Sequence, residues 1–171
     1  MKRITIGLIL CAALFSVVAC NNQQTANTEK TKMEKLENKN ENTIFPKGDK
    51  APAENFTGTV YVQMLAPKTE NNNFSVASVT FEPGARANWH IHPAGQTLLV
   101  TFGKGLYQEK GKPVRTLNKG DVVVCNPDVE HWHGASPESV MTHVVITNYK
   151  GDSQVNWLKP VTDEEYNSGV K

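Results

Sequence analysis

From about Phe56 onward, hydrophobic and polar positions alternate in short runs bounded by glycine, proline and asparagine. Because neighbouring side chains of a strand point to opposite faces, this alternation predicts half-buried strands. The predicted strands are Thr59–Leu65, Phe74–Phe81, Thr97–Phe102, Leu106–Glu109, Val114–Leu117, Asp121–Cys125 and Val140–Thr147. A helix start is found only at Thr162–Asn167, where Thr162 is the expected N-cap and Glu165 follows three residues later. The pattern predicts an all-β antiparallel sandwich or barrel with a short C-terminal helix.

The first twenty residues have a different pattern. A charged start is followed by the apolar run Ile4–Ala19, which ends directly before Cys20. The run is short for a membrane span and has the position of a signal peptide. A small residue before a cysteine at this point resembles a bacterial lipoprotein signal, which implies cleavage before Cys20 and lipidation of that residue. A plain signal peptide with an incidental cysteine and an uncleaved anchor are the alternatives.

The chain therefore divides into three predicted parts. Residues 1–19 are the signal peptide, residues 20–50 a flexible polar tether, and residues 51–171 a single domain. The tether is rich in Asn, Gln, Thr, Lys and Glu, so it has too little apolar surface to offset the entropy of folding. We expect a protein of the bacterial cell envelope that faces the periplasm and touches the membrane only through its lipid anchor.

Composition and charge exclude some classes of function. The chain has 171 residues and a formal net charge of +1, so it lacks the basic excess that would favour nucleic-acid binding. Of its three cysteines, only Cys125 lies beyond the first twenty residues, so a disulfide framework is excluded. Cys125 ends a predicted strand and is expected to be buried and unreactive.

Four of the five histidines form two His-x-His pairs, which are the candidate chemistry of the chain. His90 and His92 precede Gln96, and His131 and His133 lie about forty residues downstream. Residues two apart in a strand share a face, so each pair can present two imidazoles to one ion. The amide oxygen of Gln96 and one histidine of the second pair could complete the site. Hydrogen-bonded or exposed histidines at a rim are the alternative, but two pairs beside glycines favour a metal site.

With these residues in place, the sequence resembles the cupin family. The first cupin motif is matched by Gly84, His90, His92, Gln96 and Gly103, and the second by Gly120, Pro127 and His131. The resemblance implies a double-stranded β-helix, or jelly-roll, barrel. It also implies a metal centre whose ligands are His90, His92, Gln96 and His131. Gln96 stands where most cupins have glutamate.

The resemblance narrows to small single-domain bacterial cupins that include manganese-dependent (R)-selective hydroxynitrile lyases. These also have a glutamine at the position of Gln96. The resemblance implies a divalent transition metal, manganese first, with iron, zinc, nickel or cobalt as alternatives. It further implies a homo-oligomer, either a dimer or a tetramer.

His143 is the fifth histidine and the expected acid–base residue. Period two places it on the face of Val140–Thr147 that also carries Met141, Val145 and Thr147. If this face looks into the barrel, His143 is an unliganded imidazole near the metal; a core histidine bonded to a neighbour is the alternative. The resemblance supports the catalytic reading and assigns Ala77, Val79 and Thr147 to the substrate pocket. Related lyases have glutamine at the position of Thr147.

Three functions follow as hypotheses, each with a small molecule as the partner. The first is a hydroxynitrile lyase-like enzyme that breaks a C–C bond. A metal-dependent oxidoreductase or dioxygenase is the second. The third is an envelope lipoprotein that binds a small molecule without turnover, because fold alone does not imply catalysis.

Overall fold

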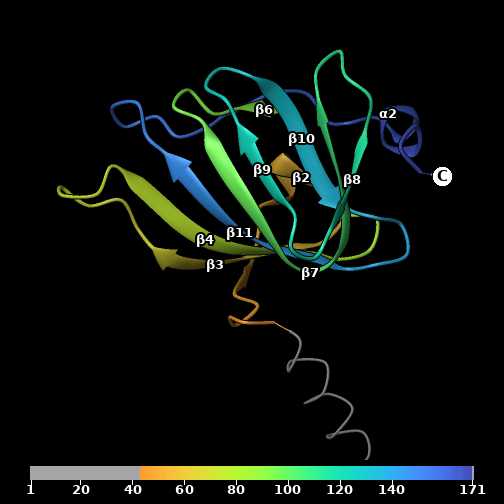
Figure 1. The fold of residues 1–171 in the computed structure, drawn as a ribbon, viewed down its shortest axis with the longest axis horizontal. Coiled ribbons are helices and arrows are strands. Elements are labelled where there is room, and N and C mark those ends of the chain that lie inside the picture. The colour runs from red at the N-terminus through yellow and green to blue at the C-terminus, as the bar shows by residue number, and fades with distance from the viewer. Residues whose placement is uncertain (1–42, 171) are drawn as a thin grey trace, which may run out of the picture. The chain divides into compact units, whose positions relative to one another are not determined.

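The computed structural model describes residues 43–170, which fold into one curled antiparallel sheet with a short helix near the C-terminal end (Figure 1). Twelve strands in this range are β1 (Asp49–Lys50), β2 (Phe56–Thr57), β3 (Val60–Ala66), β4 (Phe74–Phe81), β5 (Arg86–Ala87), β6 (His90–Ile91), β7 (Gln96–Glu109), β8 (Arg115–Asn118), β9 (Val122–Cys125), β10 (Glu130–Ala135), β11 (Met141–Asn148) and β12 (Asn156–Trp157). The helices are the 3₁₀ turn η1 (Ala53–Asn55) and the α-helix α2 (Asp163–Asn167). The predicted all-β barrel is confirmed.

The long strand β7 joins the two halves of the sheet. Its first part pairs with β11 and β9, and its second part with β10 and β8. The bend between them falls at Gly103, whose φ is +72° and whose Cβ, if it had one, would lie 1.7 Å from the carbonyl oxygen of Val140. Glycine is therefore required here. The prediction of two strands separated by a turn at Gly103–Gly105 was wrong, because the chain bends without leaving the ladder.

Most other predicted elements are found within one or two residues of their expected bounds. β4 has the predicted bounds, and α2 begins at the predicted cap, where Thr162 and Glu165 form a complete capping box. The two-residue strands β1, β2, β5 and β12 were not predicted, and one longer strand was missed, β10, which contains the second histidine pair. Its inward positions are histidines and the residue between them is tryptophan, so the strand lacks the usual pattern of apolar residues inside and polar residues outside.

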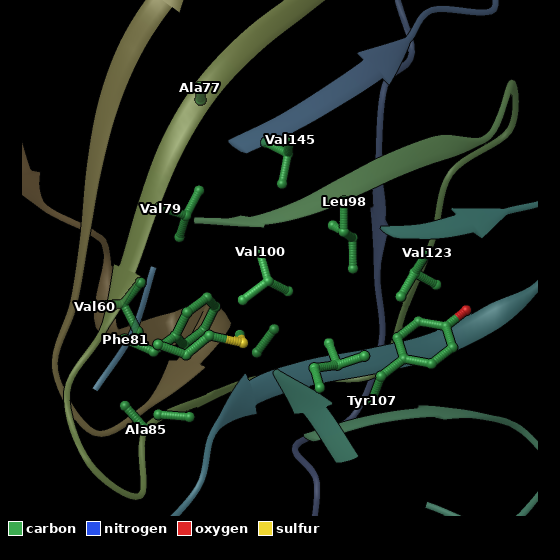
Figure 2. Close-up of a cluster of buried hydrophobic side chains, with 14 of the residues drawn as sticks. Val60, Ala77, Val79, Phe81, Ala85, Leu98, Val100, Tyr107, Val123 and Val145 are labelled. Carbon is green, nitrogen blue, oxygen red and sulfur yellow. The ribbon is translucent and has the colours of Figure 1, made fainter. Parts of the chain in front are cut away.

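Two packed clusters lie on opposite faces of the sheet. The larger cluster fills the inside of the curl, where Phe81 and Leu98 are fully buried (Figure 2). Met141, in the same cluster, is also fully buried. The smaller one packs Trp89 and Trp132 against the C-terminal segment that ends in α2. Since Trp132 stands between His131 and His133, its outward position leaves both histidines facing inward. The inner face is therefore where the candidate chemistry gathers.

The predicted signal peptide, the lipidation of Cys20 and most of the predicted tether lie outside the described residues, and these stay predictions. The sheet itself begins at Asp49, which pairs with Val62 two residues before the predicted start of the domain. Within residues 43–170, no helix has the length and apolarity needed to cross a membrane.

Candidate metal centre

Three histidines from the two sequence pairs meet at one end of the barrel interior. His90 and His131 are directly opposite each other on β6 and β10, and His92 follows β6 immediately. One ring nitrogen from each of the three lies within 4.8 Å of those from the other two, and all three residues are buried. The structure thus brings together three of the four predicted ligands in a group that could hold a metal ion.

The three rings are oriented by backbone carbonyl groups. The Nδ1 atom of His90 lies 2.7 Å from the backbone oxygen of Asn88. The Nδ1 atom of His131 lies 2.9 Å from the backbone oxygen of Val129, and the Nδ1 atom of His92 lies 2.5 Å from the backbone oxygen of Gln154. A carbonyl oxygen only accepts, so each Nδ1 carries the proton and donates it. Each Nε2 then keeps a free lone pair, which is the arrangement that second-shell partners give to metal-binding histidines.

Gln96, the fourth predicted ligand, begins β7. Its amide nitrogen donates a hydrogen bond to the hydroxyl of Thr147 at 3.0 Å, and its Oε1 is buried without a hydrogen-bond partner among the described residues. The Nε2 atoms of His92 and His131 are also buried without partners. Unpaired buried acceptors are costly in a folded protein. A divalent transition ion would satisfy them with the nitrogen and oxygen donors it prefers, so the residues fit the predicted metal.

Burial favours the neutral form of the three converging histidines. Burial, reinforced by the neighbouring His131 and His92, lowers the pKa of His90 well below its usual value. Burial also lowers the pKa of His92 to about 4 and that of His131 in the same direction. Because metal ligation needs the unprotonated ring, this environment favours ligation without a proton to remove at neutral pH.

The remaining two histidines form a second group, here called the inner pair. The Nε2 atom of His143 lies 3.2 Å from Nδ1 of His133, and both residues are buried. The ring of His133 also lies 5.2 Å from that of His90, while His143 has ring contacts with His133 and Phe81. His143 is therefore a buried histidine bonded to a neighbour, which is the alternative that the sequence left open for it. His133 lies beside His90, and His143 lies on the other side of His133.

The three predicted pocket residues lie on the same inner face as His143. Val79 pairs with His143 across β4 and β11, and Ala77 pairs with Val145 two residues further along. Ala77 and Val79 belong to the buried apolar cluster in Figure 2. Thr147 lies further along the same strand, opposite Gln96, and its hydroxyl accepts a hydrogen bond from the Gln96 amide. The arrangement gives the inner pair an apolar wall.

Cys125 lies near the ligand group without joining it. It is buried, as predicted, and the hydroxyl of Tyr107 lies 3.4 Å from its sulfur. Burial raises the pKa of Cys125 to about 11, so the thiol stays protonated at neutral pH. The ring of Tyr107 packs 5.7 Å from that of His131, which makes this pair a supporting wall behind a ligand.

Sequence reasoning missed two parts of the site. The pairing of His133 with His143 was not predicted, although the His-x-His spacing already placed His133 on the inner face. The second part is β12 with the residues just before it. The backbone carbonyl of Gln154, before β12, orients His92, and the ring of Trp157, in β12, lies 5.0 Å from that of His90. A backbone acceptor leaves no mark on the residue type, so no sequence signal could have found Gln154.

Comparisons with known proteins agree with this fold. Residues 77–147 match the family described as "Cupin domain". The chain belongs to the cupin family, since it is also 48% identical over 117 residues to a protein named (R)-mandelonitrile lyase from Granulicella tundricola. That alignment covers 68% of this chain and 89% of the relative.

Solved structures show the same fold. A cupin-like protein from Thermotoga maritima has 50% sequence identity and a TM-score of 0.71, covering 74% of this chain and 96% of that one. A cupin-2 domain from Rhodospirillum rubrum has 16% identity and a TM-score of 0.55, covering 72% of this chain and 81% of the other. At that identity the second likeness concerns the fold alone.

Proposed function

We propose that this protein is a metal-dependent lyase that cleaves a small hydroxynitrile into an aldehyde or ketone and hydrogen cyanide. The observation that carries the proposal is the buried group of three imidazoles whose Nδ1 atoms are fixed by carbonyls and whose free nitrogens converge. Support for the substrate class comes from the 48% identical relative named (R)-mandelonitrile lyase.

In the proposed centre, His90, His92, His131 and Gln96 hold a divalent ion, with manganese first among the candidates. All four are neutral donors, so none of them offsets the charge of the ion. When bound, the ion supplies Lewis acidity toward the oxygen of the substrate. The protein's part is to fix the four donors and to surround them with the apolar residues of the barrel interior.

Cleavage of a hydroxynitrile breaks the bond between the carbinol carbon and the nitrile carbon. The hydroxyl proton moves to a base, the oxygen becomes a carbonyl oxygen, and cyanide departs with the electron pair and takes up a proton. We assign this proton exchange to His143. Burial lowers its pKa to about 3, so the ring is neutral at pH 7 but a weak base. Proton transfer to it would therefore depend on the Lewis acidity that a bound ion supplies, which would make the substrate hydroxyl more acidic.

His133 supports this role by position. Its ring lies 4.9 Å from that of His143 and 5.2 Å from that of His90, so it stands between the proton-exchanging ring and the ligand group. The hydrogen bond between the two rings fixes which nitrogen of His143 can face a substrate. The unpartnered atom on His143 is Nδ1, which is buried. We therefore assign the proton exchange to Nδ1.

The test is turnover of mandelonitrile by the manganese-loaded protein, followed as release of benzaldehyde. We expect His143→Ala to lower kcat by about 10²- to 10⁴-fold, the usual contribution of a positioned acid–base group. Val144→Ala is the matched control, since Val144 is the next residue on β11 and faces away from the interior. Wild-type release no faster than that of His143→Ala would remove the lyase proposal, and oxygen uptake with the same protein would favour an oxidoreductase instead.

A further inference from the structure

The amide of Gln96 has two different ends, and the structure treats them differently. Its Nε2 donates to the hydroxyl of Thr147 at 3.0 Å, while Oε1 has no hydrogen-bond partner among the described residues. The two residues lie directly opposite each other on β7 and β11. Gln96 is 6% exposed and Thr147 is 5% exposed, so bulk water does not serve either group.

We propose that Thr147 is a positioning residue of the metal centre: its hydroxyl accepts the Gln96 amide N–H and so leaves Oε1 for the ion. The inference rests on the proposed metal site and names a residue that acts through a ligand without being one. It also changes the meaning of Thr147, which the sequence assigned to the substrate pocket.

The physical reason lies in the shape of an amide. The oxygen and the NH₂ group of glutamine are nearly equal in size, so packing does not distinguish them, and hydrogen bonding decides which end faces which way. When Oε1 serves a cation, the NH₂ group at the other end must find an acceptor in a buried place. The hydroxyl of Thr147 is the acceptor that the structure supplies.

The alternative orientation shows why the hydroxyl matters. Without an acceptor at position 147, the buried NH₂ group would lose its partner, and the amide would gain nothing from keeping its present orientation. The turned amide would place a donor where Oε1 now lies, and a donor does not bind a cation. Loss of the hydroxyl is therefore expected to weaken metal binding without removing any ligand.

Valine and serine at position 147 separate the hydroxyl from the shape of the side chain. Thr147→Val keeps the branched shape and removes the acceptor, while Thr147→Ser keeps the acceptor and loses a methyl group. We expect Thr147→Val to bind Mn²⁺ ten- to a hundredfold more weakly, the usual effect of losing an outer-shell partner. Thr147→Ser should stay close to the wild type.

The experiment measures the Kd of the full-length protein for Mn²⁺ by competition with a fluorescent chelator, and repeats it with Co²⁺ while recording the visible absorption spectrum. Gln96→Ala and the double variant Gln96→Ala/Thr147→Val complete a cycle. Because Thr147 acts only through Gln96, the double variant should bind no more weakly than Gln96→Ala. Melting of the metal-free proteins checks folding, and Thr147→Ala replaces Thr147→Val if the latter does not fold.

The outcomes separate this inference from the proposed function. A variant without the hydroxyl that binds metal as tightly as the wild type, or loses as much affinity on the Gln96→Ala background, overturns the role of Thr147. A wild-type protein that binds no metal overturns both the inference and the proposed centre. Metal binding that depends on Thr147 in a protein without turnover supports the inference and removes only the lyase.

Discussion

The barrel holds two groups of histidines that have the same residue type and similar burial but different partners. In the ligand group, His90, His92 and His131 donate from Nδ1 to backbone carbonyls and leave Nε2 free. In the inner pair, His133 and His143 bond to each other. The first group is arranged to receive an ion, and the second is arranged to hold a proton between two rings.

The difference follows from where each histidine lies along its strand. The carbonyls that serve the ligand group belong to Asn88, Val129 and Gln154, which all lie just outside strands. There the backbone leaves the ladder and an oxygen is available. The inner pair lies within β10 and β11, where the ladder uses the carbonyls, so each ring finds the other. Strand ends therefore favour metal ligation, and strand centres favour a buried pair.

The largest expected effect separates the two groups by metal content. His131→Ala removes one of three converging imidazoles and is expected to lose the bound metal, while His143→Ala is expected to keep it, since His143 touches no ligand ring. Elemental analysis of both variants, purified side by side, makes the comparison. Equal metal content in the two variants would contradict the division into a ligand group and an inner pair.

A second prediction concerns a property that the two groups share: their imidazoles are buried and their pKa values are lowered. The pKa of His92 is lowered to about 4 and that of His143 to about 3, both from about 6.5. At pH values between these lowered pKa values and 6.5, the unfolded chain binds more protons than the folded one. The free energy of unfolding therefore falls as the pH is lowered through this window. A fully buried histidine contributes about 1.4 kcal/mol for each pH unit.

Urea unfolding of the chelator-treated protein at pH 7, 6, 5 and 4 measures this loss. His143→Gln should lose less stability over the same range, because glutamine does not titrate. A free energy of unfolding that stays constant from pH 7 to pH 4 would show that the histidines are not held neutral by burial.

The smallest expected effect concerns Phe81, a core residue whose ring contacts both histidines of the inner pair and also Phe56. Its ring lies 5.5 Å from that of His133 and 5.6 Å from that of His143. Phe81→Leu nearly conserves volume, so we expect a loss of about 1 kcal/mol in the free energy of unfolding, with unchanged metal content. Unfolding in urea and elemental analysis test the two halves of this expectation. Metal loss in this variant would mean that the two groups depend on each other.

Much of the site could be predicted from spacing, and the rest depended on depth within the barrel. Period two gave the shared face of His90 and His92, but it left His131 and His133 equivalent. The cupin resemblance chose His131 over His133. The structure gives the physical reason for this choice. His131 pairs with His90, whereas His133, two residues further along β10, pairs with Tyr107 of β7. The hydrogen-bond partners of His90, His92 and His131 could not be predicted, because they are main-chain oxygens.

For the fold, alternation predicted the strands where apolar and polar residues differ clearly. It failed at β7, because Gly103 bends a strand that continues, and at β10, because its inward positions are histidines. At β10, histidines replace the apolar core pattern where the candidate site is formed. At β7 the failure lies in the middle of the strand, away from the histidines, where a glycine with positive φ allows the bend.

The central claim is that the ligand group holds one divalent metal ion in the native protein. Elemental analysis of the wild type, purified without chelator or affinity metal, tests it most directly. We predict close to one equivalent of a divalent transition metal per chain, manganese first among them. A protein that is free of metal in every preparation, and that takes up none when Mn²⁺, Fe²⁺, Co²⁺, Ni²⁺ or Zn²⁺ is added, would contradict the claim.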